Sequence, residues 1–288
     1  MKIGLLRATA MTVPAVALAM YLPFAGESWH EKAAAISLPR TVAVAPGALD
    51  YQLPGEFLTG QRPVDAPMKQ LRFRRSFDIM AYQVSVAEYA RCVDEGACKP
   101  ADGAGNKADE LPVTGINFRD ATDYAKWLTE RTGETWRLPT DEEWTFAAAE
   151  RFSSDALGLG TDSNPSVRWL ARYRSEAEAA VGSDPKPKPQ GFFGANSNGV
   201  HDLAGNVWEW TTTCYRRAAL DKTGAQTTST DNCGVRVVGG RHRGYMSFFI
   251  RDGKSGGCAA GLPPENLGIR LVKERASLMT ALKTFWLG

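Results

Sequence analysis

Two segments in the C-terminal half carry the residue types best suited to chemistry. In residues 198–211, Trp208 and Trp210 flank the carboxylate of Glu209, shortly after a Gly-Asn turn that ends at Asn206. Large aromatic side chains this close to a turn and an acid indicate a shaped site more than generic core. We therefore expect Trp208 or Trp210 to form the aromatic wall of a substrate groove.

The second segment follows the pair Gly239-Gly240 and combines a histidine with several polar side chains. The imidazole of His242 can act as a general base near neutral pH. Guanidinium groups can hold a carboxylate or a peptide carbonyl, a tyrosine hydroxyl can donate a hydrogen bond, and a carboxylate can orient a base. The residues expected to do this here are Arg241, Arg243, Tyr245 and Asp252.

Each of these residues also has a purely structural interpretation. Arginines are usually solvated or paired with surface acids, and a single histidine is often an ordinary polar loop residue. Asn266 is expected either to position substrate, with His242 as its catalytic partner, or to brace the core together with Arg270. An enzyme requires the loop around His242 and the tryptophans to meet at one concave pocket.

The composition is that of a globular protein long enough to form a hydrophobic core, and it argues against nucleic acid as a partner. The chain has 288 residues, which fits one large domain or two small ones, and 43% of them are hydrophobic and 23% charged. The net charge of +2 and the lack of a dense Lys/Arg block predict no binding to nucleic acid.

The N-terminus has the layout of a secretory signal. Lys2 and Arg7 precede an apolar run over residues 8–25, and the alanines at 33–35 offer a cleavage site. We expect residues 1–35 to be a signal peptide that directs the chain to a bacterial periplasm. The alternative is an uncleaved membrane anchor, which is the one case in which the protein would contact a membrane.

Five cysteines suit an oxidising compartment. A short Gly-containing loop separates Cys92 from Cys98, and such a loop can close with a disulfide. For the remaining three we favour the pair Cys214–Cys233, which leaves Cys258 as a thiol that is either buried and inert or reactive.

The sequence predicts both helices and strands as the elements that position these residues. Helices are expected at 86–94, where Ser85 and Glu88 form a capping box, and at 120–132, where Gly133 ends the helix. A third begins after Thr140 and reaches about 149, and a short one lies near 166–181. Strands are expected at 41–44, 70–79, 235–238 and 267–272. This mixture predicts an α+β fold with low regular content and a weakly amphipathic tail at 273–288.

Four blocks in order resemble the formylglycine-generating-enzyme-like (sulfatase-modifying factor) family. They are residues 80–93, residues 111–144, residues 198–211, and the glycines 239–240 together with residues 266–270. The resemblance spans about residues 75–272 and implies a domain at 36–272 with a C-type-lectin-like fold. It also implies one calcium ion, bound by Asn206, the carbonyl of Val207 and Glu209. The alternative is that Asn206 holds a tight turn and Glu209 caps backbone groups.

The chain departs from the family at its copper site. Copper-dependent members carry two cysteines five residues apart, and soft thiolates suit Cu(I). The corresponding positions here, counted back from Asn266, hold His242 and Ser247, and Cys258 is the only cysteine between Cys233 and Asn266. We therefore expect no copper and no formylglycine formation on sulfatases. The histidines also cannot supply the H-x-x-x-H-x-E cluster of the iron branch.

The chain is similar to a cysteine-less exported subgroup of the family. One type in that subgroup accompanies copper nitrite reductase in denitrifying bacteria, and we expect this chain to be an accessory or maturation protein of that type. An alternative is oxidative maturation of a pyoverdine-like siderophore in the periplasm. Both predict a protein or peptide-derived substrate in the periplasm. A third possibility is a non-catalytic binding module on the same fold.

Overall fold

A computed structural model describes residues 38–102, 108–152, 167, 170, 171, 173, 174, 186–247 and 266–275. All of these belong to the second of the two units into which the chain divides, Ile36–Gly288. The predicted signal peptide, Asp252, Cys258 and the tail beyond residue 275 lie outside the described residues.

The three helices begin where their capping residues predict. Helix α1 (Val86–Asp94) follows the N-cap Ser85, whose side chain bonds the backbone of Glu88 while Glu88 bonds back to Ser85. Helix α3 (Asp141–Ala148) follows Thr140 in the same way, with Glu143 as the reciprocal partner. A single 3₁₀ turn, η1 (Ala149–Arg151), continues from α3.

Helix α2 (Phe118–Thr132) begins two residues earlier than the sequence predicts. Its N-cap is Asn117, which forms a capping box with Asp120, so Asp120 lies inside the helix instead of opening it. The helix ends at Gly133, as expected, with a φ of 71° that a residue with a side chain rarely adopts. Of the helix predicted near 166–181, the described residues 167, 170, 171, 173 and 174 are helical.

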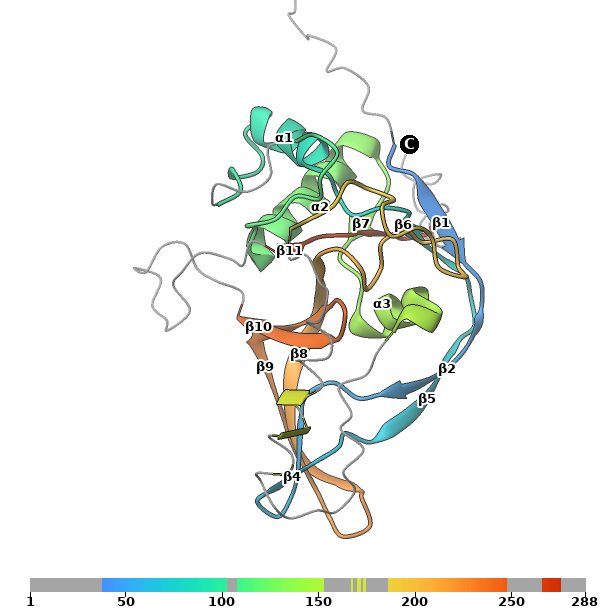
Figure 1. Ribbon diagram of the computed structural model, residues 1–288, viewed down its shortest axis with the longest axis vertical. Helices are drawn as coiled ribbons and strands as arrows, with labels where there is room; N and C mark the ends of the chain where they lie inside the picture. The colour runs from blue at the N-terminus through green and yellow to red at the C-terminus, as the bar shows by residue number, and fades with distance from the viewer. Residues whose placement is uncertain are drawn as a thin grey trace, which may run out of the picture. The chain divides into compact units, whose positions relative to one another are not determined.

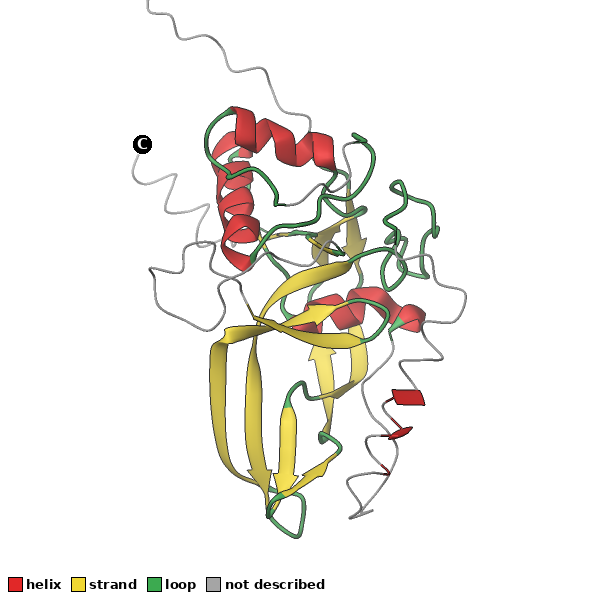
Figure 2. Ribbon diagram, turned by 60° about the vertical axis from the view of Figure 1, so that its left-hand side comes forward, coloured by secondary structure: helices red, strands yellow, loops and turns green. Residues whose placement is uncertain are grey.

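A long hairpin of β8 (Trp208–Leu220) and β9 (Gln226–Gly239) forms the centre of the largest sheet, and Figures 1 and 2 show it running away from α1 and α2. The order of strands in this sheet is β10-β9-β8-β3-β4, and β11 pairs in parallel with β8 at Trp208. The added strands are β3 (Glu56–Thr59), β4 (Arg62–Val64), β10 (Arg243–Ser247) and β11 (Leu267–Gly268).

Two smaller sheets complete the described strands. One has the order β1-β6-β12-β7, and the other pairs β2 with β5. The strands are β1 (Thr41–Val44), β2 (Gly47–Gln52), β5 (Met68–Phe73), β6 (Phe77–Met80), β7 (Trp136–Arg137) and β12 (Val272–Lys273). Mixed short strands and helices confirm the predicted α+β class.

Three strand predictions need correction. The strand predicted at 70–79 is two strands, because the chain changes sheets between Phe73 and Phe77. The strand predicted at 267–272 is interrupted between Gly268 and Val272, and Arg270 lies in the gap. The strand predicted at 235–238 is the end of the much longer β9. The sequence did not predict its partner, β8.

Two hydrophobic clusters lie on either side of β8. The larger packs α1 and α2 against Trp210 and Leu267, and the second packs α3 and its residue Trp144 against β6. Because both faces of β8 are covered at its beginning, the side chains of Glu209 and Trp210 are held in place by core packing. None of the helices among the described residues combines the length and apolarity needed to cross a bilayer.

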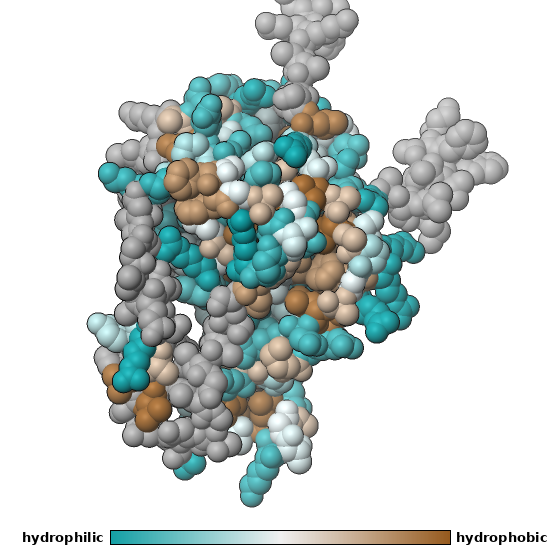
Figure 3. Space-filling model, turned by 45° about the vertical axis from the view of Figure 1, so that its right-hand side comes forward, coloured by the Kyte–Doolittle hydropathy of each residue, from teal (hydrophilic) through white to brown (hydrophobic). Residues whose placement is uncertain are grey.

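Large hydrophobic side chains are exposed only at scattered points of the described chain. They come from separate segments and are Leu38, Met68, Leu170, Tyr173 and Phe192. On the face seen in Figure 3, hydrophobic residues are interspersed with hydrophilic ones. Single exposed hydrophobic residues are normal for a protein surface, so these do not mark a binding site.

Candidate functional site

Glu209 is the centre of a buried polar network. Its side chain is 0% exposed, and both carboxylate oxygens accept two hydrogen bonds each. Oε1 accepts from Nε2 of Gln83 at 2.8 Å and from Nη2 of Arg270 at 3.0 Å. Oε2 accepts from the indole nitrogen of Trp144 at 2.7 Å and from Nε of Arg270 at 3.0 Å. A carboxylate has about four lone-pair positions, so all of them are used.

The local chain explains why Arg270 reaches this position. Strand β11 runs parallel to β8, with Gly268 opposite Glu209, and the chain leaves the strand directly afterwards. A Cβ on Gly268 would lie 2.7 Å from the carbonyl oxygen of Val113, so this close approach requires a glycine. Arg270 then also donates to the carbonyls of Met80 and His201, each at 2.8 Å. It thereby holds three separate segments around β8.

The residues predicted to bind calcium are bound within the protein instead. The side chain of Asn206 exchanges two hydrogen bonds with the backbone of Lys188, at 2.9 and 2.8 Å. The carbonyl of Val207 accepts from Gln83 at 3.4 Å, and Glu209 has no free lone pair. Glu209, the charged member of the predicted set, therefore has no acceptor position left for a calcium ion. Across the described residues, no three His, Cys, Asp or Glu side chains are grouped to hold a metal.

Trp210 does not form the wall of a groove. It is 0% exposed, its indole nitrogen donates to the carbonyl of Ile116 at 3.0 Å, and its ring meets Phe118 edge-on. A buried tryptophan with its N–H satisfied is a core residue. The aromatic wall predicted for this segment can therefore come only from Trp208.

Arg243 does not clamp a substrate. Its guanidinium is buried, and Nη2 lies 2.8 Å from Oδ2 of Asp141 in an ion pair whose side chains are 0% and 1% exposed. The hydroxyl of Tyr51 donates to the same oxygen at 2.6 Å. Burial, followed by the adjacent Asp141 carboxylate, raises the pKa of Tyr51, so this hydroxyl keeps its proton. Arg243 therefore joins β10 to the N-terminus of α3.

Tyr245 and Arg241 are also engaged. The hydroxyl of Tyr245 accepts a hydrogen bond from the backbone N–H of Gly55 at 2.7 Å, and its ring meets Tyr215 edge-on. Arg241 is half-buried and has interaction partners of its own. Asp252 lies outside the described residues. Arg243 and Tyr245 of the predicted polar groove thus bond to other parts of the protein.

Trp208 and His242 are brought together at the end of the β9–β10 connection. Their ring centroids lie 5.4 Å apart at 72°, and both side chains are half-buried. Nδ1 of His242 lies 2.9 Å from the carbonyl oxygen of Arg243. Since a carbonyl can only accept, Nδ1 donates this hydrogen bond, and in the tautomer with its proton on Nδ1 the ring's acceptor is Nε2. Nε2 bonds no other described residue.

Gly240 lets the ring of Trp208 pack against the backbone that follows β9. A Cβ on Gly240 would be 2.5 Å from Cδ1 of Trp208, closer than a side chain can come. The backbone N–H of Trp208 donates to the carbonyl of Asn266 at 2.8 Å, which fixes Asn266 beside it. We name Trp208, His242 and Asn266 the Trp208–His242 surface.

The sequence missed the residues that hold the two buried carboxylates. Gln83 and Trp144 donate to Glu209, and Tyr51 donates to Asp141, which pairs with Arg243. None of Gln83, Trp144, Asp141 and Tyr51 was singled out. Asp141 carried a partial signal, because its position in the first turn of α3 favours a negative charge. The pairings themselves join residues 61–126 positions apart, which no local pattern predicts.

Both expected disulfides are present. Cys92 pairs with Cys98, and Cys214 pairs with Cys233. With five cysteines in the chain, Cys258 is the one left. A single thiol cannot provide the two thiolates of a copper site, whichever residues surround it.

Comparison with known proteins identifies the family. The Sulfatase-modifying factor enzyme 1-like domain matches residues 27–275, a longer stretch than the 75–272 expected from the motifs. "Inactive C-alpha-formylglycine-generating enzyme 2" of Mus musculus is 33% identical over 124 residues, or 42% of this chain and 38% of that protein. "Formylglycine-generating enzyme" of Mycobacterium tuberculosis is 35% identical over 118 residues, or 39% of this chain and 35% of that protein.

These alignments span less than two fifths of the length of the curated relatives. "Hercynine oxygenase" of M. tuberculosis also matches, with 32% identity over 38% of this chain and 23% of that protein. Among solved structures, PvdO from Pseudomonas aeruginosa superposes with a TM-score of 0.53 and 21% identity, covering 82% of this chain and 95% of that one. The C-type-lectin-like α+β fold is thereby confirmed. The chain belongs to the family of the Sulfatase-modifying factor enzyme 1-like domain.

Proposed function

We propose that the protein is an exported maturation factor that acts on a protein or peptide-derived substrate in a bacterial periplasm. The Trp208–His242 surface carries this proposal, because Nδ1 of His242 bonds the carbonyl of Arg243 and Nε2, beside an aromatic ring, bonds no other described residue. The two disulfides support export, since such bonds persist in oxidising compartments.

Each member of the surface has a defined task in such a reaction. The ring of Trp208 binds a flat or apolar part of the substrate. Nε2 of His242 accepts a proton from the substrate, and the carbonyl of Arg243 stabilises the imidazolium that forms by accepting from Nδ1. The side-chain amide of Asn266 has no partner among the described residues and can hydrogen bond the substrate. An oxidative step would require an external electron acceptor such as O₂ in addition.

A non-catalytic binding module is the second candidate. One of the relatives is named an inactive enzyme, and Cys258 is the one cysteine of this chain outside the two disulfides, whereas copper-dependent members use two thiols. The two candidates make different demands on His242. A binding module needs the shape of the surface, whereas an enzyme also needs the basic nitrogen.

We predict that His242→Gln abolishes function while Trp208 remains in place. Proton transfer by a positioned base contributes roughly 10²–10⁴-fold to a rate, and glutamine retains hydrogen bonding without a basic nitrogen. The measurement is complementation of a strain that lacks the protein, read by mass spectrometry of periplasmic peptides and peptide-derived metabolites. Intact disulfides and an unchanged melting temperature serve as the control for folding.

Comparison with Trp208→Ala separates the candidates. If both variants fail, the enzyme is supported. If His242→Gln restores the wild-type profile and Trp208→Ala does not, the protein is a binding module. Full restoration by both variants would contradict any role for the surface.

The same strains report on the partner. We propose copper nitrite reductase as the protein that this chain serves, on the basis of its resemblance to the nitrite-reductase accessory type. Loss of nitrite reductase activity in the deletion strain, with normal siderophore, would support this partner. Loss of mature pyoverdine-like chromophore with normal nitrite reductase would support siderophore maturation instead.

A further inference from the structure

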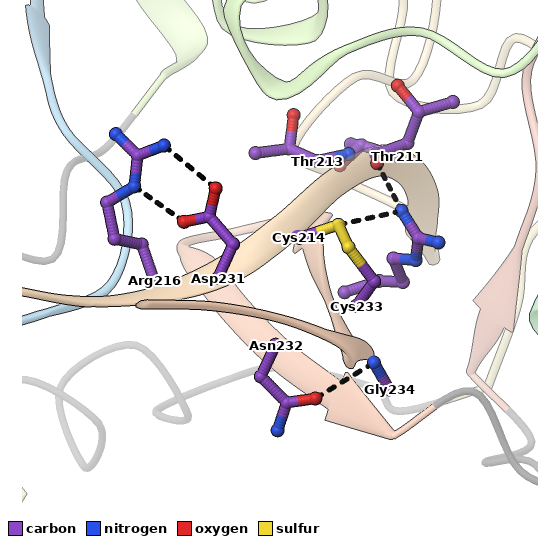
Figure 4. The surroundings of a disulfide bond; sticks show 10 residues. Thr211, Thr213, Cys214, Arg216, Asp231, Asn232, Cys233 and Gly234 are labelled. Atoms are coloured by element: carbon purple, nitrogen blue, oxygen red, sulfur yellow. Dashed lines mark hydrogen bonds and ion pairs between the residues drawn. A yellow bond between two sulfur atoms is a disulfide. The ribbon is translucent and has the colours of Figure 1, made fainter. Parts of the chain in front are cut away.

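The disulfide between Cys214 and Cys233 is asymmetric in its surroundings. It joins β8 to β9 where the register shifts, because Cys214 lies opposite Arg236 while Tyr215 lies opposite Asn232. Cys233 is exposed and Cys214 is half-buried. Cys233 is therefore the more exposed residue of the pair, and Figure 4 shows the bond that joins the two.

A guanidinium lies against the sulfur of Cys214, the less exposed residue. Nη1 of Arg236 is 3.2 Å from Sγ of Cys214 and 2.5 Å from the carbonyl oxygen of Thr212. Its carbon Cζ lies 4.2 Å from the centroid of the Phe118 ring, which fixes the group in place. Among the described residues, no carboxylate forms an ion pair with Arg236. Burial lowers the pKa of Arg236, as expected for a partly desolvated cation without a counter-ion.

This arrangement favours negative charge on Cys214. A neutral disulfide sulfur is a weak acceptor, whereas a thiolate at the same position would give Arg236 an anionic partner, which no described carboxylate supplies. In thiol–disulfide exchange, the sulfur that is not attacked leaves as a thiolate, and a leaving thiol of lower pKa leaves faster. Arg236 thus selects Cys214 as the leaving group.

We propose that the Cys214–Cys233 disulfide is a thiol-exchange site, in which an incoming thiolate attacks Cys233 and Cys214 leaves. The new bond joins the incoming sulfur to Sγ of Cys233, and the bond between the two cysteines breaks. The electron pair remains on Sγ of Cys214 as a thiolate, which pairs with Arg236. A second thiol of the same class releases the mixed disulfide, so that two thiols are oxidised and the protein disulfide is reduced.

The surroundings of Cys233 permit such an attack. Gly234 has no side chain, and its N–H is held by Oδ1 of Asn232 at 3.0 Å, which stabilises the irregular backbone independently of the disulfide. The nearby carboxylate of Asp231 is bound by Arg216 through two contacts, at 2.7 and 3.0 Å. Because Arg216 neutralises most of this charge, Asp231 repels an approaching thiolate only weakly (Figure 4).

The exchange site is distinct from the Trp208–His242 surface. Cys214 follows Trp208 by six positions on β8, or roughly 20 Å at about 3.3 Å per residue. The inference therefore goes beyond the proposed function and does not depend on it. The chemical class of the ligand is a thiol, either a free small thiol or a cysteine of a peptide.

The test uses the full chain with Cys258→Ser, so that no other thiol of the protein takes part. With limiting glutathione, we expect Cys214–Cys233 to be reduced at least about tenfold faster than Cys92–Cys98, whose cysteines are 0% and 6% exposed. Trapping with acid and peptide mapping should find glutathione on Cys233. Glutathione mainly on Cys214 would overturn the proposed direction of attack.

Two variants test the role of Arg236. Arg236→Gln should slow reduction of Cys214–Cys233 by about fivefold, whereas Arg217→Gln, an exposed arginine on β8 paired with Glu56, should not. In the reduced protein, alkylation across pH should give a lower pKa for Cys214 than for Cys233, and Arg236→Gln should remove the difference. Equal rates for the two variants, or equal pKa values in the parent protein, would overturn the proposal.

A second arm identifies the source of the thiol. The glutathione assay is repeated with a short cysteine-containing peptide at the same concentration and pH. Faster reaction of glutathione assigns a small thiol, and faster reaction of the peptide assigns a protein cysteine. Reaction of neither, under conditions that reduce an unstructured peptide disulfide, contradicts the exchange site.

Discussion

Replacing Glu209 with alanine is expected to lower the free energy of unfolding by about 3–5 kcal/mol. The change leaves the guanidinium of Arg270 buried without its counter-ion and removes the acceptor for the indole N–H of Trp144. Both consequences are costly, because an unpaired charge and an unsatisfied donor then remain in a dry environment. Denaturant unfolding of the purified protein measures the loss.

The loss should be the same with calcium and with a chelator. All four acceptor positions of Glu209 are used by protein donors, so calcium has no oxygen of this side chain to bind. Glu130→Ala is the matched control, since it removes a carboxylate from an exposed pair with Lys126 on α2. That variant should lose no more than about 0.5 kcal/mol. A loss confined to calcium-containing buffer would establish Glu209 as a calcium ligand and contradict the structure.

Arg243→Met should have a similarly large effect, also about 3–5 kcal/mol. It leaves the carboxylate of Asp141 buried with only the hydroxyl of Tyr51 and no positive charge. The matched control is Arg241→Met, two residues earlier in the chain and half-buried, which should lose less than about 1 kcal/mol. Thermal and denaturant unfolding both report the difference.

A double variant tests the cause of that loss. Arg243→Met combined with Asp141→Leu removes both charges and should recover part of the stability, because no unpaired ion then remains. Equal stability of Arg243→Met and Arg241→Met would show that Arg243 is not part of the core. In that case the residue would be available to bind substrate, as the sequence alone predicts.

Local signals predicted the helices well. The capping boxes at Ser85 and Thr140 and the glycine at 133 fix helix ends through bonds between residues a few positions apart. The error at α2 has the same local origin, since Asn117 and Asp120 form a capping box that begins the helix earlier. The disulfide Cys92–Cys98 was likewise predicted from the short loop between its cysteines, whereas Cys214–Cys233 was favoured among pairings that the sequence left open.

The roles of Trp208, Glu209 and Trp210 could not be derived in this way. Alternate residues on a strand face opposite sides, so a sheet with one solvated face would place both tryptophans together and Glu209 in water. Strand β8 instead lies between two cores, and Glu209 faces Trp144 of the second. The acid could be buried only because Arg270, 61 positions later, supplies a charge. That pairing depends on the parallel contact of β11 with β8.

Arg243 is a second residue whose role depends on a partner far away in the sequence. A run of arginine, histidine and arginine indicates a polar surface, and two of its three members remain half-buried. The third, Arg243, is the first residue of β10. It is buried because Asp141 in the first turn of α3 pairs with it. In the sequence, Asp141 follows the N-cap Thr140, and its favourable interaction with the helix dipole already accounts for an acid at that position. Nothing local indicated that it also pairs with Arg243.

The most direct test of the central claim is a formylglycine assay on the purified protein. The claim is that the chain holds no thiol pair for Cu(I), since four of its five cysteines form disulfides and Cys258 stands alone. The protein is loaded with copper, freed of unbound metal, and incubated with O₂, a reductant and a cysteine peptide of the sulfatase type. We predict less than one copper per chain and no aldehyde in the peptide by mass spectrometry. Catalytic conversion of the cysteine to formylglycine would contradict the claim.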